Sequence, residues 1–305
     1  MIDINNPHDS LIKDILKEKD SAREFLAVAL PHEISHLIDL RSLKHEEISL
    51  KDEKLSEYHL DMLFSVKTKE GYSLKIYLLL EHKSVKDKEI YNQILHYIAL
   101  LHRYHKIKEP ILPLIYYHGK RKWNIPLTFM DTLNISAKVC LPIENFLLQF
   151  KAVIFNTHDK DILNLKINLH LKAVLYLMKN IWSMNTLKDL EDYFDFIRDL
   201  FYEQSASKFV EKLLIYLYSS RKIKPEDMKK AIVHTISEKK GELAMTTAEL
   251  LIKEGIEKGI EKGIEKGHYE KALEMAKKLL SKGMSFSDIA EVSGLTIEDV
   301  EALSK

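Results

Sequence analysis

The clearest pattern along the chain is a pair of apolar runs separated by a polar turn. The runs are YHLDMLFSV at 58–66 and YSLKIYLLLEHKS at 72–84, and KTKEG lies between them. Because Gly71 lies in this turn, the two runs predict an antiparallel hairpin.

Helical patterns and a buried run flank this hairpin. Residues 9–30 and 87–106 carry apolar side chains at mostly helical spacing, and EEISL at 46–50 is a candidate short strand. The continuous apolar run ILPLIYYHG at 111–119 predicts a buried strand. The first part of the chain is therefore expected to run helix, three strands, helix, strand, which is an α/β arrangement.

The rest of the chain is predicted to be mostly helical. One more strand is expected around 151–156. Helical patterns follow at 170–179, 187–201, 206–218 and 225–237. We predict three regions, with boundaries at 1–160, 161–240 and 241–305.

The last region contains a four-residue repeat, GIEKGIEKGIEKG at 255–267. Its glycines are either a small-residue stripe where another helix packs or part of a flexible charged linker, since glycine weakens an isolated helix. An amphipathic helix ending at Gly283 and two short helices around Ser293-Gly294 are expected after it. The final helix is acidic and would repel phosphates, so we expect self-association or partner binding there.

Composition limits the class of protein. The 305 residues are 46% hydrophobic and 30% charged, with a formal net charge of +0, so any surface that binds nucleic acid must be local. The single cysteine, Cys140, excludes intrachain disulfides and a cysteine zinc cluster. We see no signal peptide, no apolar run long enough to span a bilayer, and no P-loop or dinucleotide fingerprint. We expect a soluble, cytoplasmic protein without a nucleotide cofactor.

Charged side chains interrupt the apolar strands of the hairpin. Asp61 lies in the first strand, and Glu81 and Lys83 end the second one after the apolar run 76–80. Side chains alternate along a strand, so Glu81 and Lys83 are expected on one face and His82 on the other. Such charges are costly at the end of a hydrophobic sheet unless a metal or a catalytic task uses them.

This group suits phosphodiester hydrolysis. A divalent cation held by two carboxylates can activate a water and neutralise a phosphate. Asp61 and Glu81 would supply the carboxylates, and the backbone carbonyl of His82 could add a ligand. Lys83 would orient the water or offset developing charge. The alternative is a half-exposed hairpin whose charges face water.

Gln93 and Tyr97 form a second candidate group. They are spaced i, i+4 on the helix expected after the second strand, so they share one face. Their amide and phenol could hold the lysine, a metal-bound water or a DNA backbone. The alternative is a core tyrosine and a solvent-facing glutamine.

D…ExK on a hairpin, followed by QxxxY on the next helix, resembles the PD-(D/E)XK nuclease superfamily in its RecB-like branch. More narrowly, the chain resembles the Rpn/YhgA-like family of recombination-promoting nucleases and transposase-like proteins. The matching segments are PHDSLIK at 7–13, REFLAVALP at 23–31, LDMLFSV at 60–66, YLLLEHKS at 77–84 and LPLIYYHGKRKW at 112–123. The Gly-Ile-Glu-Lys repeat is also typical of the family's tails.

The resemblance implies a restriction-endonuclease-like αβββαβ core, metal-dependent DNA endonuclease activity and a bacterial cytoplasmic setting. Carried over by position, Asp61 and Glu81 would be metal ligands and Lys83 catalytic. Gln93 and Tyr97 would support them.

One feature of the superfamily pattern differs in this chain, and another has more than one candidate residue. Leu60 stands where many members have a proline before the first aspartate. Some relatives have an acid on the first helix; Asp9, Asp14 and Glu24 are candidates here, and Asp9 is preferred.

Local basic clusters are candidate DNA contacts. The phosphate-binding candidates are Lys86, Lys88, Arg103, Lys120, Arg121 and Lys122. The alternative is solvated faces balanced by nearby acids. His118 ends a buried strand near the expected site, where it is either close to substrate or structural.

HEISH at 32–36 matches the zinc-peptidase pattern HExxH, with His32 and His36 as ligands. A zincin would also need a continuous helix and a third ligand, but Pro31 places this motif at a helix start. We therefore place a zinc peptidase third among the candidate functions.

We predict a Mg²⁺-dependent DNA endonuclease that promotes DNA recombination or transposition-like events, with Ca²⁺ or Mn²⁺ as other candidate cations. DNA is the expected partner, and the C-terminal region is expected to form a homodimer. The alternative is a catalytically weak DNA- or partner-binding protein on a nuclease scaffold.

Overall fold

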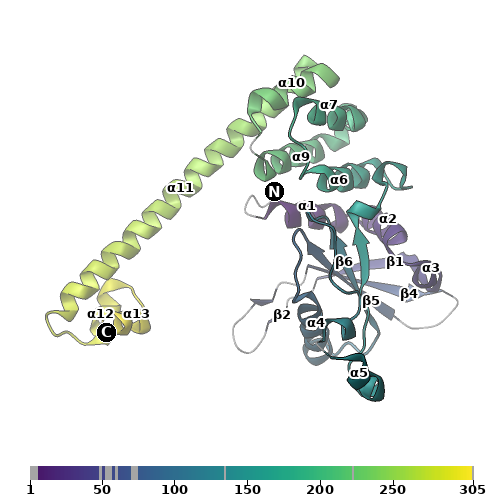
Figure 1. The fold of residues 1–305 in the computed structure, drawn as a ribbon. Coiled ribbons are helices and arrows are strands. Elements are labelled where there is room, and N and C mark those ends of the chain that lie inside the picture. Colours follow the sequence, from purple (N-terminus) through teal and green to yellow (C-terminus); the bar gives the residue numbers. More distant parts are fainter. Residues whose placement is uncertain are drawn as a thin grey trace. The chain divides into compact units, whose positions relative to one another are not determined.

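A computed structural model of the chain is drawn in Figure 1. It describes residues 6–47, 50–51, 57–58, 61–69, 75–133, 135–221 and 223–303. The chain forms two compact units, Met1–Met245 and Thr246–Lys305. The first unit is mixed α/β, with a central sheet among many helices.

Two helices, α1 (Pro7–Lys17) and α2 (Lys19–Ala29), begin the described chain. The prediction of one helix over 9–30 was wrong, because Glu18 has extended backbone (φ −71°, ψ 115°) and ends the first helix. The segment KEKD at 17–20 has no apolar side chain that the core could bury. Nothing apolar therefore holds the two halves in line, and each buries its own face.

The first strand was predicted in the wrong place. After α3 (His32–Leu37), strand β1 covers Ile38–Glu46 rather than 46–50, where residues 48–49 lie outside the described chain. A register shift between Asp39 and Lys44 breaks the alternation of β1, which hides its strand pattern in the sequence. Next, β2 (Leu50–Lys51) pairs with β3 (Glu57–Tyr58) in a separate two-stranded sheet.

The central sheet has the strand order β1-β4-β5-β6-β7. The predicted hairpin is confirmed, because β4 (Met62–Thr68) pairs antiparallel with β5 (Lys75–Lys83); its turn lies outside the described residues. Helix α4 (Ile90–Tyr104) then leads to β6 (Ile111–Tyr117), which pairs parallel with β5. The expected last strand is β7 (Val153–Asn156), parallel to β6.

Each face of the sheet is buried by different helices. Met62, Phe64 and Val66 share the larger core with α1 and α2, whereas Leu63 packs with Ile94 and the rest of α4. Tyr77 of β5 belongs to the same core as α4, and strand alternation therefore places Glu81, four residues later, on the α4 side as well. Figure 1 shows α1 and α2 lying between the sheet and the helices that follow.

Those later helices complete the larger core. They are α6 (Leu169–Asn180), α7 (Leu187–Phe196), α8 (Arg198–Tyr202), α9 (Ser207–Ser220) and α10 (Pro225–Thr235). None of the described residues of α5 (Ala137–Ile143) belongs to this core. The helix expected at 187–201 is divided at Ile197, whose backbone leaves the helical range (φ −99°, ψ 15°). Buried residues from α6, α7, α9 and α10 join those of α1 and α2 in one core. The region boundaries at 160 and 240 stay predictions.

Short 3-10 turns connect several of these elements. They lie at Met130–Thr132, Glu144–Phe146, Thr157–Asp159, Ile162–Asn164 and Gln204–Ala206.

The C-terminal segment consists of α11 (Glu238–Leu280), α12 (Phe286–Ser293) and α13 (Ile297–Ala302). The glycine repeat is helical throughout, so it is not a coil linker. Gly294 ends α12 with φ 72°, which confirms the two short helices expected around it. A small apolar core formed by Ala276, Ile289, Leu295 and Val300 joins these helices. Among the described residues, no helix combines the length and apolar character that crossing a membrane requires.

Candidate active site

A cleft of about 440 Å³ lies where α1, the start of β4, the end of β5 and α4 meet. Its lining residues are Asn6, Asp9, Lys13, Asp61, Glu81, His82, Lys83, Ser84, Val85 and Gln93. The two predicted carboxylates, the predicted lysine and the glutamine therefore share one cleft, although they come from three separate segments of the chain.

Glu81 is the most deeply buried charge of this cleft, at 1% exposure. It lies opposite Ile115 of β6, with β4 on its other side, so the sheet itself shields it. Its Oε2 accepts a hydrogen bond from Gln93 Nε2 (3.0 Å), whereas no described residue makes a hydrogen bond of standard geometry to the buried Oε1. Burial, and then the charge of Asp61, raise the pKa of Glu81 well above its usual range. The ammonium groups of Lys83 and Lys13 lower this pKa, but they do not offset the effects of burial and Asp61.

Asp61 directly precedes β4 and is held from two sides. Its Oδ2 accepts a hydrogen bond from the backbone N–H of His82 (2.7 Å). Its Oδ1 lies 2.8 Å from Lys13 Nζ, and the same ammonium lies 2.8 Å from Asp9 Oδ2. Lys13 thus connects α1 to the strand pair.

Gln93 connects the lysine of the ExK motif to its glutamate. Its Oε1 accepts a hydrogen bond from Lys83 Nζ (2.7 Å), and its Nε2 donates to Glu81 Oε2 and to Tyr97 Oη (2.9 Å). Lys83 Nζ also lies 3.1 Å from Asp87 Oδ2. Burial, and then the charge of Glu81, raise the pKa of Tyr97 to about 12, so its phenol is protonated at neutral pH.

His82 projects from the opposite face of β5, as strand alternation predicts. Its ring stacks on His118 with centroids 5.0 Å apart, and its Nδ1 lies 3.7 Å from Asp9 Oδ1. His118 is fully buried, its backbone carbonyl accepts from Trp182 Nε1 (2.8 Å), and it is not part of the cleft lining. Burial, and then the charge of His82, lower the pKa of nearby His8 to about 4. These rings pack together next to the cleft, and His82 is the one that also lines it.

The three candidate first-helix acids have different neighbours. Asp9 lines the cleft. Asp14 pairs instead with Lys212 Nζ (2.5 Å), and Glu24 accepts from the backbone N–H of Asn168 (2.5 Å). Sequence reasoning missed Lys13, although its i, i+4 spacing from Asp9 within PHDSLIK signals a shared helix face.

The six candidate DNA contacts lie outside the cleft lining. Lys88, Lys120, Arg121 and Lys122 are exposed in loops after β5 and β6, and Lys86 is half-buried. Arg103 is exposed in the last turn of α4, where its guanidinium lies 5.1 Å from the centroid of Tyr104. Their role as phosphate contacts stays a prediction.

In the described part of the chain, the zinc motif has no third ligand. His32 and His36 lie on the six-residue α3 with ring centroids 3.9 Å apart. Within the described chain, no group of three or more His, Cys, Asp or Glu side chains is arranged to hold a metal. Mg²⁺ does not need three such side chains, because it commonly uses one or two carboxylates and completes its shell with water and phosphate.

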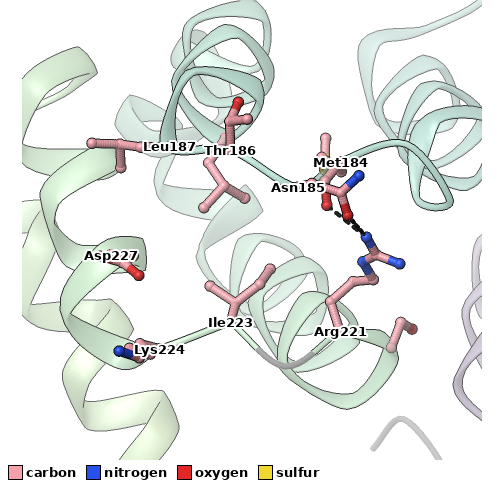
Figure 2. A pocket seen from close by; sticks show the side chains of 10 residues that line it. Met184, Asn185, Thr186, Leu187, Arg221, Ile223, Lys224 and Asp227 are labelled. Atoms are coloured by element: carbon pink, nitrogen blue, oxygen red, sulfur yellow. Dashed lines mark hydrogen bonds between the residues drawn. The ribbon is translucent and has the colours of Figure 1, made fainter.

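Another cavity, of about 510 Å³, lies among α7, α9 and α10 (Figure 2). Arg221 points toward Met184 and Asn185 there and donates to the Met184 carbonyl (3.0 Å) and to the Asn185 amide oxygen. Its guanidinium thus ties two loops together. Asp227 is the only acid in the lining of this cavity, so it offers no carboxylate pair.

The family of the chain follows from its sequence match. A family model described as "Putative transposase, YhgA-like" covers residues 6–208, which include every segment of the cleft. The chain belongs to the YhgA-like transposase family. This membership confirms the resemblance to the Rpn/YhgA-like family found in the sequence.

Several members of the YhgA-like family are named nucleases. Recombination-promoting nuclease RpnA of Escherichia coli (strain K12) is 29% identical over 310 residues, which span 99% of this chain and 98% of RpnA. Recombination-promoting nuclease RpnD of Escherichia coli O157:H7 is 40% identical over 123 residues, or 38% of this chain and 47% of RpnD.

One YhgA-like relative carries a different name. Inactive recombination-promoting nuclease-like protein RpnE of Escherichia coli (strain K12) is 31% identical over 121 residues, which are 38% of this chain and 40% of RpnE. No solved structure matches the chain at a significant level.

Proposed function

We propose that this YhgA-like protein is a Mg²⁺-dependent DNA endonuclease with a restriction-endonuclease-like core, acting in DNA recombination or transposition-like events. The observation that carries the proposal is the buried Glu81 carboxylate. Among the described residues, none makes a hydrogen bond of standard geometry to its Oε1. Asp61 lies in the same cleft, and Gln93 connects Glu81 to Lys83. A desolvated carboxylate oxygen without a partner is costly, and a divalent cation would satisfy it.

The donor set also suits a hard cation. Carboxylate oxygens of Asp61 and Glu81 are the ligands that Mg²⁺ prefers, and the backbone carbonyl of His82 is a further candidate. A divalent ion bound there supplies an activated water and neutralises the phosphate. The relatives named nucleases, and the antiparallel-then-parallel order of β4, β5 and β6, agree with such a core.

Side chains of the cleft then divide the work of hydrolysis. The water oxygen attacks phosphorus and gives up one proton to the surrounding solvent, the bond from phosphorus to the leaving oxygen breaks, and that oxygen takes a proton from solvent. Lys83 Nζ is aimed by Gln93 and Asp87, so it can orient the water or offset charge on the phosphate. Gln93 fixes this lysine relative to Glu81, because one amide bonds both. Tyr97 fixes Gln93 in turn.

The second candidate is a catalytically weak DNA- or partner-binding protein on the same scaffold. It is favoured by the name of RpnE, an inactive relative. Against it, Asp61, Glu81, Lys83 and Gln93 are all present here and meet in one cleft. A homodimer through the C-terminal region and a cytoplasmic setting stay predictions within the same proposal.

Cleavage of supercoiled plasmid DNA tests the proposal. Wild-type protein is incubated with Mg²⁺, Mn²⁺, Ca²⁺ or chelator, with a matched single-stranded RNA as a second substrate. We expect DNA cutting with Mg²⁺ and none with chelator. Asp61→Asn should cut on the order of a hundredfold more slowly, because a carboxylate ligand is lost.

The matched control is Asp192→Asn, which removes an exposed α7 carboxylate that pairs with Lys188. This variant should cut like the wild type. Unchanged cutting by a folded Asp61→Asn would end the proposal, and DNA binding without cutting in any metal would favour the second candidate.

A further inference from the structure

Lys13 lies between two acids of the cleft. It sits one helical turn after Asp9 on α1, and its Nζ is 2.8 Å from both Asp9 Oδ2 and Asp61 Oδ1. The three side chains are only 16–24% exposed, so water screens them weakly. This carboxylate–ammonium–carboxylate bridge joins α1 to the start of β4.

The bridge neutralises negative charge where it would otherwise accumulate. Asp9, Asp61 and Glu81 all line the cleft. The Lys13 side chain carries an ammonium group, which is ordinarily charged at neutral pH, and this group contacts both Asp61 and Asp9. Lys13 is therefore a permanent cation among three carboxyl groups.

The two lysines of the cleft have different partners. Lys83 is held by Gln93 and Asp87, on the α4 side of β5. Lys13 instead bonds the Oδ1 oxygen of Asp61, while Oδ2 accepts from the backbone N–H of His82. Lys13 thus contacts a different oxygen of Asp61 from the one that accepts the backbone hydrogen bond of His82.

We propose that Lys13 is a tethered counter-cation, which neutralises Asp9 and Asp61 in the metal-free protein and competes with a divalent cation for Asp61. The inference rests on the proposed metal site. Asp9 is the positioning residue that holds Lys13 on this side of the cleft. Asp61 stays oriented without Lys13, because the His82 N–H still holds its other oxygen. Removing the ammonium should therefore strengthen metal binding rather than weaken it.

Calorimetric titration of the full-length protein with Ca²⁺ tests this directly and needs no cleavage. Lys13→Met should bind Ca²⁺ on the order of tenfold more tightly than wild type, because a nearby like charge is removed from a partly buried site. Adding Asp61→Asn to Lys13→Met should abolish the gain.

Two control variants separate charge from packing. Lys13→Arg keeps the charge and should stay within about twofold of wild type. Lys212→Met breaks the other ion pair of α1, with Asp14, outside the cleft. It should leave Ca²⁺ affinity unchanged. If Lys13→Met folds only with Ca²⁺ present, this Ca²⁺-dependent folding supports the inference. The Ca²⁺ affinity is then measured on Lys13→Gln, which also lacks the ammonium group.

The outcomes separate this inference from the proposed function. Tighter binding by Lys13→Met supports it even if the wild type binds Ca²⁺ too weakly to measure. Equal or weaker binding by Lys13→Met overturns it, while Mg²⁺-dependent cutting by the wild type would leave the nuclease proposal standing. Absence of binding in both proteins overturns the inference as well.

Discussion

Glu81 is a buried acid whose environment opposes its charge. Its pKa in the folded protein is raised above the ordinary 4.5 by burial and by Asp61. The folded state therefore holds this proton to higher pH than the unfolded state does. As pH rises from about 4.5 through the folded pKa, the metal-free protein loses stability at this site, and the loss is complete above it.

Glu81→Gln removes this titration and keeps the shape. Without metal, the variant should be more stable than wild type at pH 8, and the difference should shrink as pH falls toward about 4.5. Urea unfolding of both proteins in chelator, from pH 8 to pH 5, measures it. A difference that does not change with pH would contradict the environment described for Glu81.

Gln93 bonds both Lys83 and Glu81, so under the proposed function its removal should harm catalysis more than folding. Gln93→Ala should cut DNA about ten- to a hundredfold more slowly, because such supporting partners are commonly worth that much. The control is Asn92→Ala, which removes an exposed neighbour bonded to Glu89. Single-turnover cleavage and a melting curve measure both effects. Equal cleavage rates for Gln93→Ala and Asn92→Ala would contradict this role of Gln93.

The sequence predicted much of the arrangement of single residues in the candidate site. Strand alternation correctly separated Glu81 and Lys83 from His82, and i, i+4 spacing correctly paired Gln93 with Tyr97. Lys13 was missed because its partner Asp61 lies 48 residues away on another element. Only tertiary packing of α1 against the strands brings these two residues together.

At the scale of elements, the end of β5 is fixed by a close approach of the chain at Gly119. A Cβ there would lie 2.6 Å from the Ser84 carbonyl oxygen and 2.6 Å from Tyr117 Cε2. Gly119→Ala should therefore cost about 1–3 kcal/mol of stability. It should also slow cleavage, because Ser84 directly follows Lys83.

Gly267→Ala is the matched substitution, because no atom lies within 4 Å of its Cβ position in α11. It should leave cleavage unchanged and stabilise the helix by up to about 1 kcal/mol. Melting curves and plasmid cleavage of both variants measure these effects. A Gly119→Ala protein as stable and active as wild type would contradict the tight contact.

Elements with strong periodicity were predicted well, and those without it were not. The hairpin, α4, β6 and β7 have long apolar patterns that match their final burial. Strand β1 has a register shift that removes its alternation, and the break at Glu18 lies in a charged stretch with no proline or glycine. Local sequence holds no signal for these features, because packing onto the sheet decides them.

At the scale of the whole molecule, the cleft and the larger core belong to the first unit. The last member of that core is Ala244, and the family match ends at residue 208. A chain ending at Met245 should therefore fold and keep Mg²⁺-dependent nicking of plasmid DNA. If the tail pairs two copies, double-strand cutting should fall while nicking persists. Gel analysis of nicked and linear products measures this, and loss of folding would contradict the division into units.

The central claim is that Asp61 and Glu81 hold the cation that supports DNA cleavage. Anomalous diffraction from crystals of the full-length protein soaked in Mn²⁺ tests it most directly. The account predicts a Mn²⁺ peak within about 2.2 Å of carboxylate oxygens of Asp61 and Glu81, in an octahedral oxygen shell. A cleft with no such peak, at a Mn²⁺ concentration that supports cutting, would contradict it.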